Sequence, residues 1–367
     1  MQLLDLTLTN FKNIESAKLD FSPKINCLLG DNGMGKSNLL DAIHYMSFCR
    51  SFSLVPDQML IKNGEDFMMA KGHYLRRDVA EELQLSMQKG HRKALKRGGK
   101  EYERLSDHIG VFPVVLASPA DSELAKGTSE ERRRWMDMVI SQENHPYLEA
   151  LIRYSKALQQ RNRLLRDGTR DPGLFTAIEL QMAMAEAVIT PARKVWTIRL
   201  SERVRHYYSE IAGDATETPV LSFSSSTAGI PLEEALAANR QRDEFMKHTT
   251  VGPHRDDIMM ELNGMPLKRT ASQGQTKTFT TALRLAQYDF LREATGLKPL
   301  LLLDDIFDKL DSRRVEKIMQ LVTATEFGQI FITDTNRRHL DEIIAITTGD
   351  RRLWTVTDGR FSLTSQI

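Results

Sequence analysis

A glycine-rich segment near the start of the chain has the residue types and the spacing needed to hold a phosphate chain. Residues 30–37 read Gly-Asp-Asn-Gly-Met-Gly-Lys-Ser, which fits the pattern G-x-x-x-x-G-K-[ST]. Glycines let backbone N–H groups turn toward an anion, a lysine at this spacing reaches the β- and γ-phosphates, and the serine hydroxyl can ligate Mg²⁺. We therefore expect the whole loop to bind ATP, Lys36 also to serve catalysis, and Ser37 to hold the metal. The loop residues are Gly30, Asp31, Asn32, Gly33, Met34, Gly35, Lys36 and Ser37.

The segments on either side of this loop have the patterns that a phosphate loop requires. Residues 25–29 are mostly apolar and predict a short buried strand. After the loop, Leu39, Leu40, Ile43 and Met46 fall on one face of a helix, whose positive N-terminus would face the anion. The alternative, a glycine-rich turn that matches the pattern by chance, does not require this strand and helix.

A second acidic motif follows a strongly apolar segment late in the chain. Four leucines at 300–303 are followed by Asp304 and Asp305. In phosphate-loop proteins the first such carboxylate holds the Mg²⁺ shell, so we assign Asp304 to the metal together with Ser37. We expect Asp305 to orient the attacking water as a catalytic residue. The alternative is a buried strand that meets a helix N-cap, where Asp is common.

The segment Ser-Gln-Gly-Gln at 272–275 lies at the start of a predicted helix over 275–293. The Ser272 hydroxyl, close backbone approach at Gly274 and the amide of Gln275 would make a second anion site at a helix N-terminus. One chain seldom needs two phosphate sites on one nucleotide. We therefore expect these residues to bind the nucleotide of a second subunit. A capped surface helix is the alternative.

Composition indicates an ordinary globular protein with room for two domains. The chain has 367 residues, 41% hydrophobic and 27% charged, with a net charge of +1 that does not by itself indicate nucleic-acid binding. Cys27 and Cys49 are too few for a disulfide framework, so we expect reduced buried thiols. The longest aliphatic run, 300–303, is far short of a membrane span, and no leader opens the sequence. We expect a cytoplasmic protein that has no membrane contact.

Periodicity along the chain predicts an α/β fold with a helical insertion. Alternating apolar residues predict strands in the first hundred residues, and 128–212 favours helices that are interrupted at Pro146 and at a turn over 166–173, as in an αα-hairpin. Later elements are predicted as strands at 257–262, 299–303 and 329–332, helices over 275–293, from 312 and from 338, and hairpin turns at 263–264 and 358–359. Continuous apolar strands that alternate with helices indicate a parallel core sheet covered on both faces. We expect a split head (1–127 and 250–367) and a helical insertion (128–249).

In combination these motifs resemble the ABC-type ATPase heads of DNA repair and chromosome-maintenance proteins, and the chain is most similar to the RecF family of bacterial recombination mediators. The resemblance extends over nearly the whole chain. Further segments that carry it are 10–13, 38–43, 50–52, 126–127, 132–134, 252–257 and, after the Asp-Asp strand, 308–311.

This resemblance implies a fold and an activity. The fold would be an ABC-type phosphate-loop ATPase head with a parallel core sheet and an antiparallel β-subdomain, plus an α-helical arm. The activity would be a slow, DNA-stimulated ATPase whose ATP-bound homodimer clamps single-/double-strand junctions or gaps. RecO and RecR would help it load RecA in repair, replication restart and SOS induction, at the nucleoid.

Other proteins with such a head are the alternatives. A repair nuclease would need a further domain, a chromosome organiser hundreds of residues of coiled coil, and a transporter ATPase the usual sensor histidine. Thr333 and the two residues after it stand where that histidine would be. Ala120 replaces a common acidic residue, which leaves Asp121 as the nearest polar candidate for the Q-loop, and Ala271 replaces a leucine of the signature. Asp305 stands where transporters have glutamate, and its shorter arm suits slow hydrolysis.

Three basic groups are candidates for contacting DNA phosphates without sequence preference. For any one group, a solvated helix face balanced by glutamates is the alternative, and DNA binding is favoured here because the resemblance implies it. The groups are residues 91–100; Arg161, Arg163, Arg166 and Arg170; and Arg193, Lys194, Arg199, Arg203 and Arg205.

Overall fold

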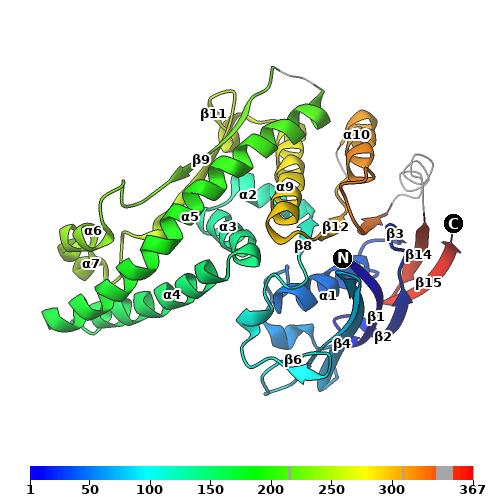
Figure 1. Cartoon of the computed structure of the whole chain (residues 1–367), viewed down its shortest axis with the longest axis horizontal. Helices are drawn as coiled ribbons and strands as arrows, with labels where there is room; N and C mark the ends of the chain where they lie inside the picture. The colour runs from blue at the N-terminus through cyan, green and yellow to red at the C-terminus, as the bar shows by residue number, and fades with distance from the viewer. Residues whose placement is uncertain (214–215, 308–309, 336–349, 367) are drawn as a thin grey trace. The chain divides into compact units, whose positions relative to one another are not determined.

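The chain folds into two compact units in the computed structural model, which describes residues 1–213, 216–307, 310–335 and 350–366. Unit 1 comprises 1–121 and 287–367, and unit 2 comprises 122–286 (Figure 1). These limits differ from the expected 128–249 insertion because the short sheet after the long helices packs within unit 2. The division into a split ATPase head (1–127 and 250–367) and a helical insertion (128–249) stays a prediction. The predicted helix from 338 and the first two residues of the 308–311 segment lie outside the described residues.

Unit 1 contains the predicted parallel core sheet. Its strand order is β15-β14-β3-β13-β12-β8, parallel throughout except for the terminal β14–β15 hairpin. The apolar strands at its centre are almost fully buried, as parallel strands with covered faces must be. The bounds are β3 Ile25–Leu29, β8 Val114–Ala117, β12 Leu300–Asp304, β13 Ile330–Asp334, β14 Arg351–Thr357 and β15 Arg360–Gln366.

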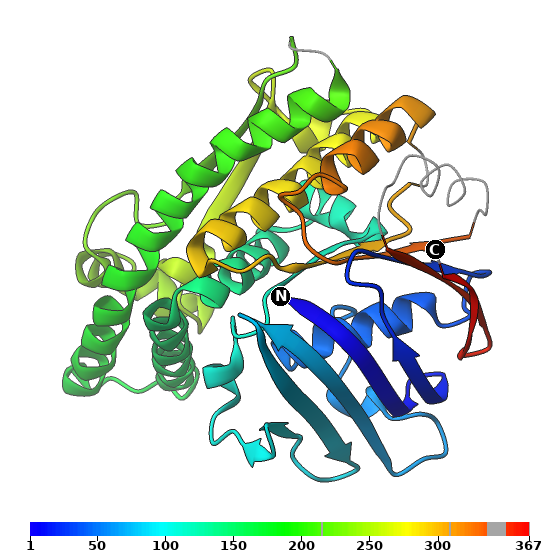
Figure 2. The ribbon, with the colours of Figure 1, turned by 45° about the vertical axis from the view of Figure 1, so that its right-hand side comes forward.

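An antiparallel sheet forms the second layer of unit 1, as the alternating N-terminal segments predict. Its order is β2-β1-β4-β5-β6-β7, and α1 (Lys36–Phe48) contributes to one hydrophobic core with both sheets (Figure 2). The remaining elements of the unit are β1 Gln2–Phe11, β2 Ile14–Asp20, β4 Phe67–Arg76, β5 Val79–Gln88, β6 Ala94–Arg97, β7 Lys100–Glu101, α10 Ser312–Val322, η1 Asp57–Leu60, η2 Leu105–His108 and η3 Pro119–Asp121.

Unit 2 is built on the predicted αα-hairpin. α3 (Ser129–Glu143) is followed by α4 (His145–Arg166), which has Pro146 in its first turn. A proline there loses no helical hydrogen bond, so the helix restarts at the predicted break. α5 (Pro172–Ala212) runs back alongside α4 (Figures 1 and 2).

Of the described helices, α5 alone is long and apolar enough by length and composition to cross a membrane. The run-length argument from sequence did not find it because its apolar residues are interrupted by charges. Its packing against α4 and β9, and its buried Arg193, are those of a helix inside a folded unit.

A three-stranded sheet, β11-β10-β9, completes unit 2. The β10–β11 turn has Asn263 at φ 55° and Gly264 at φ 74°, the left-handed pair that the Asn-Gly signal predicts. The elements are α2 Ser122–Lys126, β9 Pro219–Ser224, α6 Leu232–Ala238, α7 Arg240–Met246, η4 Pro253–Arg255, β10 Asp257–Leu262, β11 Met265–Pro266, α8 Leu267–Thr270 and α9 Gln273–Thr295, which continues into unit 1.

Candidate nucleotide-binding site

The glycine-rich loop joins β3 to α1, as its sequence predicts. Gly35 caps α1 with φ 111°, a conformation that strains any residue with a Cβ. Gly30 must lack a side chain for a different reason, because a Cβ there would overlap the carbonyl of Val356. The loop therefore curls tightly at the N-terminus of α1, where backbone N–H groups and the helix dipole favour an anion.

The Lys36 side chain is held against the backbone of this loop. Its ammonium donates to the carbonyl oxygens of Gly30 (2.7 Å) and Asp31 (3.0 Å), and the residue is 3% exposed. A lysine ammonium has three N–H donors, so one donor remains for a phosphate oxygen.

The predicted metal residues meet although they are far apart in sequence. The Ser37 hydroxyl donates to Asp304 Oδ1 at 2.8 Å, and the Thr333 hydroxyl donates to the same oxygen at 2.7 Å. Burial raises the pKa of the Asp304 carboxyl, and the two hydroxyl hydrogen bonds oppose that rise. A serine hydroxyl and a carboxylate are hard oxygen ligands, so this set fits Mg²⁺.

Asp305 follows directly and has an unusual backbone. Its φ is 45°, in the left-handed region that a non-glycine residue seldom adopts. Its N–H donates to Thr333 Oγ1 at 3.0 Å. Sequence reasoning treated Thr333 only as the place of a missing histidine. The parallel register that pairs Asp304 with Thr333 is what brings its hydroxyl here.

The turn between β1 and β2 braces the loop. Asn13 donates through Nδ2 to the Gly33 carbonyl (3.4 Å) and accepts from Asn38 Nδ2 (2.8 Å). Two segments noted for family resemblance, 10–13 and 38–43, therefore support the phosphate loop.

Asp41 joins a third such segment to these two. It is fully buried, pairs with the Lys12 ammonium at 2.5 Å, and accepts from Ser51 Oγ (2.7 Å) and the Phe52 N–H (2.9 Å). The 50–52 segment is thereby fixed to α1, the helix that the phosphate loop begins.

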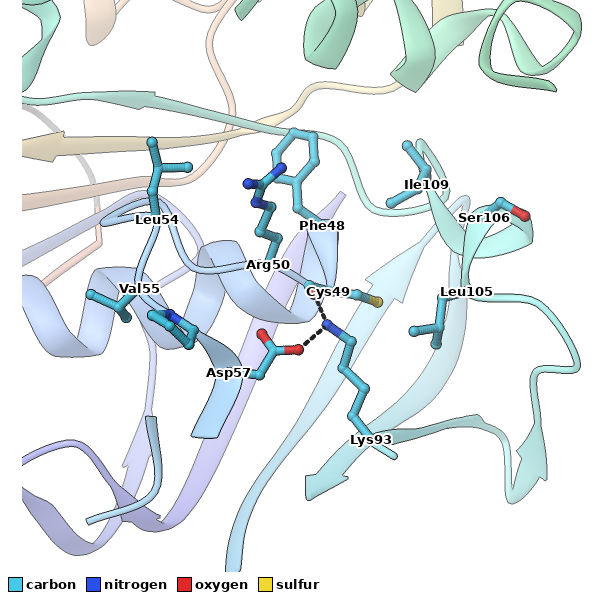
Figure 3. Close-up of a pocket in the computed structure, with 11 residues that line it drawn as sticks. Phe48, Cys49, Arg50, Leu54, Val55, Asp57, Lys93, Leu105, Ser106 and Ile109 are labelled. Atoms are coloured by element: carbon cyan, nitrogen blue, oxygen red, sulfur yellow. Dashed lines mark hydrogen bonds and ion pairs between the residues drawn. The ribbon is translucent and has the colours of Figure 1, made fainter. Parts of the chain in front are cut away.

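Arg50 borders a pocket of about 480 Å³ beyond the C-terminal end of α1 (Figure 3). Lys93 donates there to the Cys49 carbonyl and pairs with Asp57 at 2.6 Å, so two of the polar groups satisfy each other. None of the predicted nucleotide residues lines it. The lining is Phe48, Cys49, Arg50, Leu54, Val55, Pro56, Asp57, Lys93, Leu105, Ser106 and Ile109.

The Ser272 segment belongs to unit 2 and forms a capping box at the start of α9. Ser272 Oγ accepts from the Gln275 N–H (3.1 Å), while Gln275 Oε1 accepts from the Ser272 N–H (2.8 Å). Ser272 is exposed, and Gly274 is partly exposed. The cap that sequence reasoning held as the alternative is present, and a role toward a second subunit stays a prediction.

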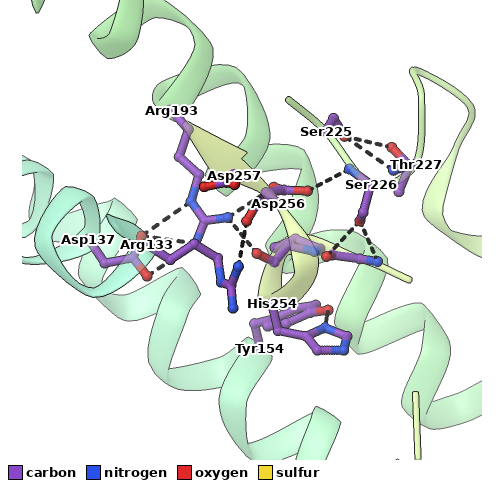
Figure 4. A network of polar contacts seen from close by, with 12 residues as sticks. Arg133, Asp137, Tyr154, Arg193, Ser225, Ser226, Thr227, His254, Asp256 and Asp257 are labelled. Carbon is purple, nitrogen blue, oxygen red and sulfur yellow. Dashed lines mark hydrogen bonds and ion pairs between the residues drawn. The ribbon is translucent and has the colours of Figure 1, made fainter. Parts of the chain in front are cut away.

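The 252–257 segment forms a buried polar network with the helices of unit 2 (Figure 4). Arg193 pairs with Asp137 and Asp256, both at 2.9 Å, and Arg132 pairs with Asp257 at 2.7 Å. Arg161, paired with two other carboxylates, is fully buried, and Arg193 is 2% exposed. These two arginines therefore do not offer their charge to DNA in this structure, contrary to their grouping by sequence.

Two smaller predictions concern Asp121 and the cysteines. Asp121, the candidate for the Q-loop, is buried and accepts from the Ser118 N–H at 3.1 Å. Cys27 and Cys49 are free and buried, as predicted, and burial raises the pKa of each thiol to about 12.

Comparison with known proteins agrees with this geometry. The family model described as RecF/RecN/SMC N terminal domain matches residues 2–350. The DNA replication and repair protein RecF of Parabacteroides distasonis is 46% identical over 359 residues and 98% of each chain, and that of Porphyromonas gingivalis strain W83 is 47% identical over 98% of this chain and 99% of its own.

Solved structures lead to the same family. The recombination mediator RecF with ATP is 28% identical, with a TM-score of 0.90 over 99% of this chain and 98% of that one. The Smc head domain of Pyrococcus furiosus shares the fold, at 14% identity and a TM-score of 0.58 over 100% of this chain and 96% of its own. The chain therefore belongs to the RecF family of DNA replication and repair ATPases.

Proposed function

We propose that the chain is an ATP-switched, DNA-binding recombination mediator that works as a homodimer. The observation that carries the proposal is the convergence of Lys36, Ser37 and Asp304 at the start of α1. This arrangement supplies an N–H donor for a phosphate oxygen, from Lys36, and two metal ligands, from Ser37 and Asp304. Two copies would enclose two nucleotides, and each loop would face the Ser272 segment of the other copy.

Each site residue has a distinct role in this proposal. Lys36 uses its remaining N–H donor on the β- and γ-phosphates, and the loop N–H groups bind the phosphate oxygens between them. Ser37 and Asp304 would hold Mg²⁺, which would neutralise charge on the phosphates when bound. Asp305 orients the water, and its short arm favours slow turnover that suits a switch. DNA binding would stimulate that turnover.

DNA would be bound through phosphates by the cations that remain exposed, without sequence preference and with strong salt dependence. The expected arm, 128–249, carries two of the three basic groups. Loading of RecA with RecO and RecR, at single-/double-strand junctions or gaps in nucleoid DNA, is what the family resemblance implies. A similar solved structure is described as a recombination mediator in the RecFOR pathway, which supports this part of the proposal. Within the three basic groups, the cations exposed in the structure are Arg92, Lys100, Arg163, Arg166, Arg170, Lys194, Arg199 and Arg205.

Light scattering with and without ATP and a gapped duplex tests the dimer. We expect the wild-type chain to dimerise only with ATP. Lys36→Met should lose ATP binding because the loop loses its positive charge. Ser272→Arg should bind ATP through its own intact loop but fail to dimerise, because a bulky cation replaces the exposed hydroxyl. Thr176→Arg, at an exposed hydroxyl in the second turn of α5, is the matched control and should behave as wild type.

A mixture of the two variants gives the decisive result. Each variant disables a different half of the composite site, so a mixed dimer keeps one intact site. The mixture should regain partial ATP-dependent pairing that neither variant shows alone. Dimerisation of Ser272→Arg alone with wild-type affinity would reduce the Ser272 segment to a helix cap.

A further inference from the structure

Thr333 lies at the end of β13, beside the Asp-Asp motif and away from the phosphate loop in sequence. It is fully buried, and the parallel register of β12 and β13 places it opposite Asp304. Its hydroxyl donates to Asp304 Oδ1 (2.7 Å) and accepts from the Asp305 N–H (3.0 Å). One hydroxyl has one donor and two acceptor positions, so both bonds form at once.

The first of these bonds fixes the Asp304 carboxylate. Oδ1 accepts from Ser37 as well as from Thr333, and Oδ2 accepts no hydrogen bond from any described residue. The carboxylate is therefore held by one oxygen while the other stays available. A buried carboxylate without these partners would be free to rotate away from a metal.

The second bond fixes the backbone of Asp305. A left-handed conformation in a non-glycine residue is strained and persists only where its surroundings impose it. The bond from the Asp305 N–H to Thr333 supplies such a constraint. By fixing the backbone of Asp305, it sets the position from which the Asp305 side chain extends.

We infer that Thr333 is a positioning residue of the ATP site, whose single hydroxyl orients Asp304 for Mg²⁺ and Asp305 for the attacking water. It acts through these two residues and does not touch the nucleotide. A sensor histidine, by contrast, would contact the γ-phosphate itself. The inference rests on the proposed ATPase function.

Thr333→Val tests the inference because valine has nearly the same shape and no hydroxyl. Groups that orient metal ligands typically change metal affinity or activity 10–100-fold when removed. We expect the Mg²⁺ concentration for half-maximal binding of a fluorescent ATP analogue to rise by about 10–100-fold. Binding of the analogue without Mg²⁺ should stay as in wild type, because Lys36 and the loop are unchanged.

Two further variants separate positioning from packing. Thr333→Ser keeps the hydroxyl and should restore the Mg²⁺ dependence. Thr355→Val removes a threonine hydroxyl from β14, which is separated from β13 by β3 in the same sheet, and should change nothing. Among the described residues, the Thr355 hydroxyl bonds only the exposed Thr364 hydroxyl. If the valine variant does not fold, Thr333→Ala is measured in the same titration with the same expectation.

The outcomes distinguish this inference from the proposed function. A wild-type chain that binds the analogue without regard to Mg²⁺ would contradict the proposed function. A Mg²⁺-dependent wild type together with an unchanged Thr333→Val or Thr333→Ala variant would overturn the positioning role alone. An equal defect in Thr333→Ser would also overturn it, because the hydroxyl would then not be the group that matters.

Discussion

Unit 1 and unit 2 each bury a cluster of charged residues, but the two clusters differ in how many hydrogen-bond donors and acceptors remain unused. In unit 1, Lys36 keeps one donor and Asp304 keeps one oxygen. In unit 2, the Arg193 guanidinium uses all three of its nitrogens on the protein. A cluster with spare capacity is suited to a ligand, and a saturated cluster holds elements of the fold together.

The saturated cluster explains a family motif that the nucleotide site does not use. Arg193 donates to Asp137 and Tyr147, and to the Pro253 carbonyl and Asp256 in the 252–257 segment. Burial raises the pKa of the Asp256 carboxyl, while the guanidinium favours its charged form. The motif therefore ties η4 and β10 to α3, α4 and α5.

The largest effect is expected when Arg193 is replaced, because this tests whether the saturated cluster stabilises unit 2. Arg193→Met should lower the free energy of unfolding by about 3–5 kcal/mol, because it leaves Asp137 and Asp256 without their partner in a buried place. Urea denaturation followed by circular dichroism measures this loss. Lys194→Met, one residue along and exposed, should change stability by no more than about 0.5 kcal/mol. A loss at Arg193 as small as at Lys194 would show that the cluster does not stabilise unit 2.

Local sequence patterns were enough to predict most elements and the phosphate loop. Gly-x-x-x-x-Gly-Lys-Ser, Asn263-Gly264 and Pro146 each act within a few residues, so their geometry follows from their neighbours. Thr333 was not assigned a role because its contact with Asp304 depends on strand register. Arg161 was grouped with DNA contacts because a charge pattern does not show which side of a helix is buried or where its carboxylate partners lie.

Each unit also contains a histidine whose pKa is lowered by burial, His108 in unit 1 and His254 in unit 2, so the stability of both units depends on pH. His254 Nε2 donates to the Thr249 carbonyl and Nδ1 accepts from the Tyr154 hydroxyl, while His108 Nε2 donates to the Met46 carbonyl. Burial lowers the pKa of both imidazoles from 6.5 to about 4. Between about pH 4 and pH 6.5 these histidines are therefore protonated in the unfolded chain but neutral in the folded chain.

Stability should therefore fall as the pH drops from about 6.5 to about 4, by roughly 3 kcal/mol for each histidine, with no further loss from these groups below that range. Urea denaturation at a series of pH values measures it. His254→Gln can keep both hydrogen bonds without titrating, so it should remove about half of the decline. His91→Gln, at an exposed position, should leave it unchanged. A decline of equal size in both variants would contradict the assignment to His254.

Ser272 should give the smallest change in stability, but it separates a structural role from a binding role most directly. Its hydroxyl makes a local structural hydrogen bond, and the residue is also exposed. Its hydroxyl caps α9 by accepting from the Gln275 N–H, and loss of such a cap costs about 1 kcal/mol. Ser272→Ala should therefore lower the free energy of unfolding by about that amount, and Ser272→Asp, which also caps, should restore it. Both variants remove the neutral hydroxyl that would face a second nucleotide, and aspartate adds a negative charge there. If the segment only caps its helix, ATP-dependent dimerisation should follow stability and return in Ser272→Asp. If it meets a phosphate, Ser272→Asp should be as stable as wild type and yet dimerise less than Ser272→Ala, because its carboxylate repels the anion.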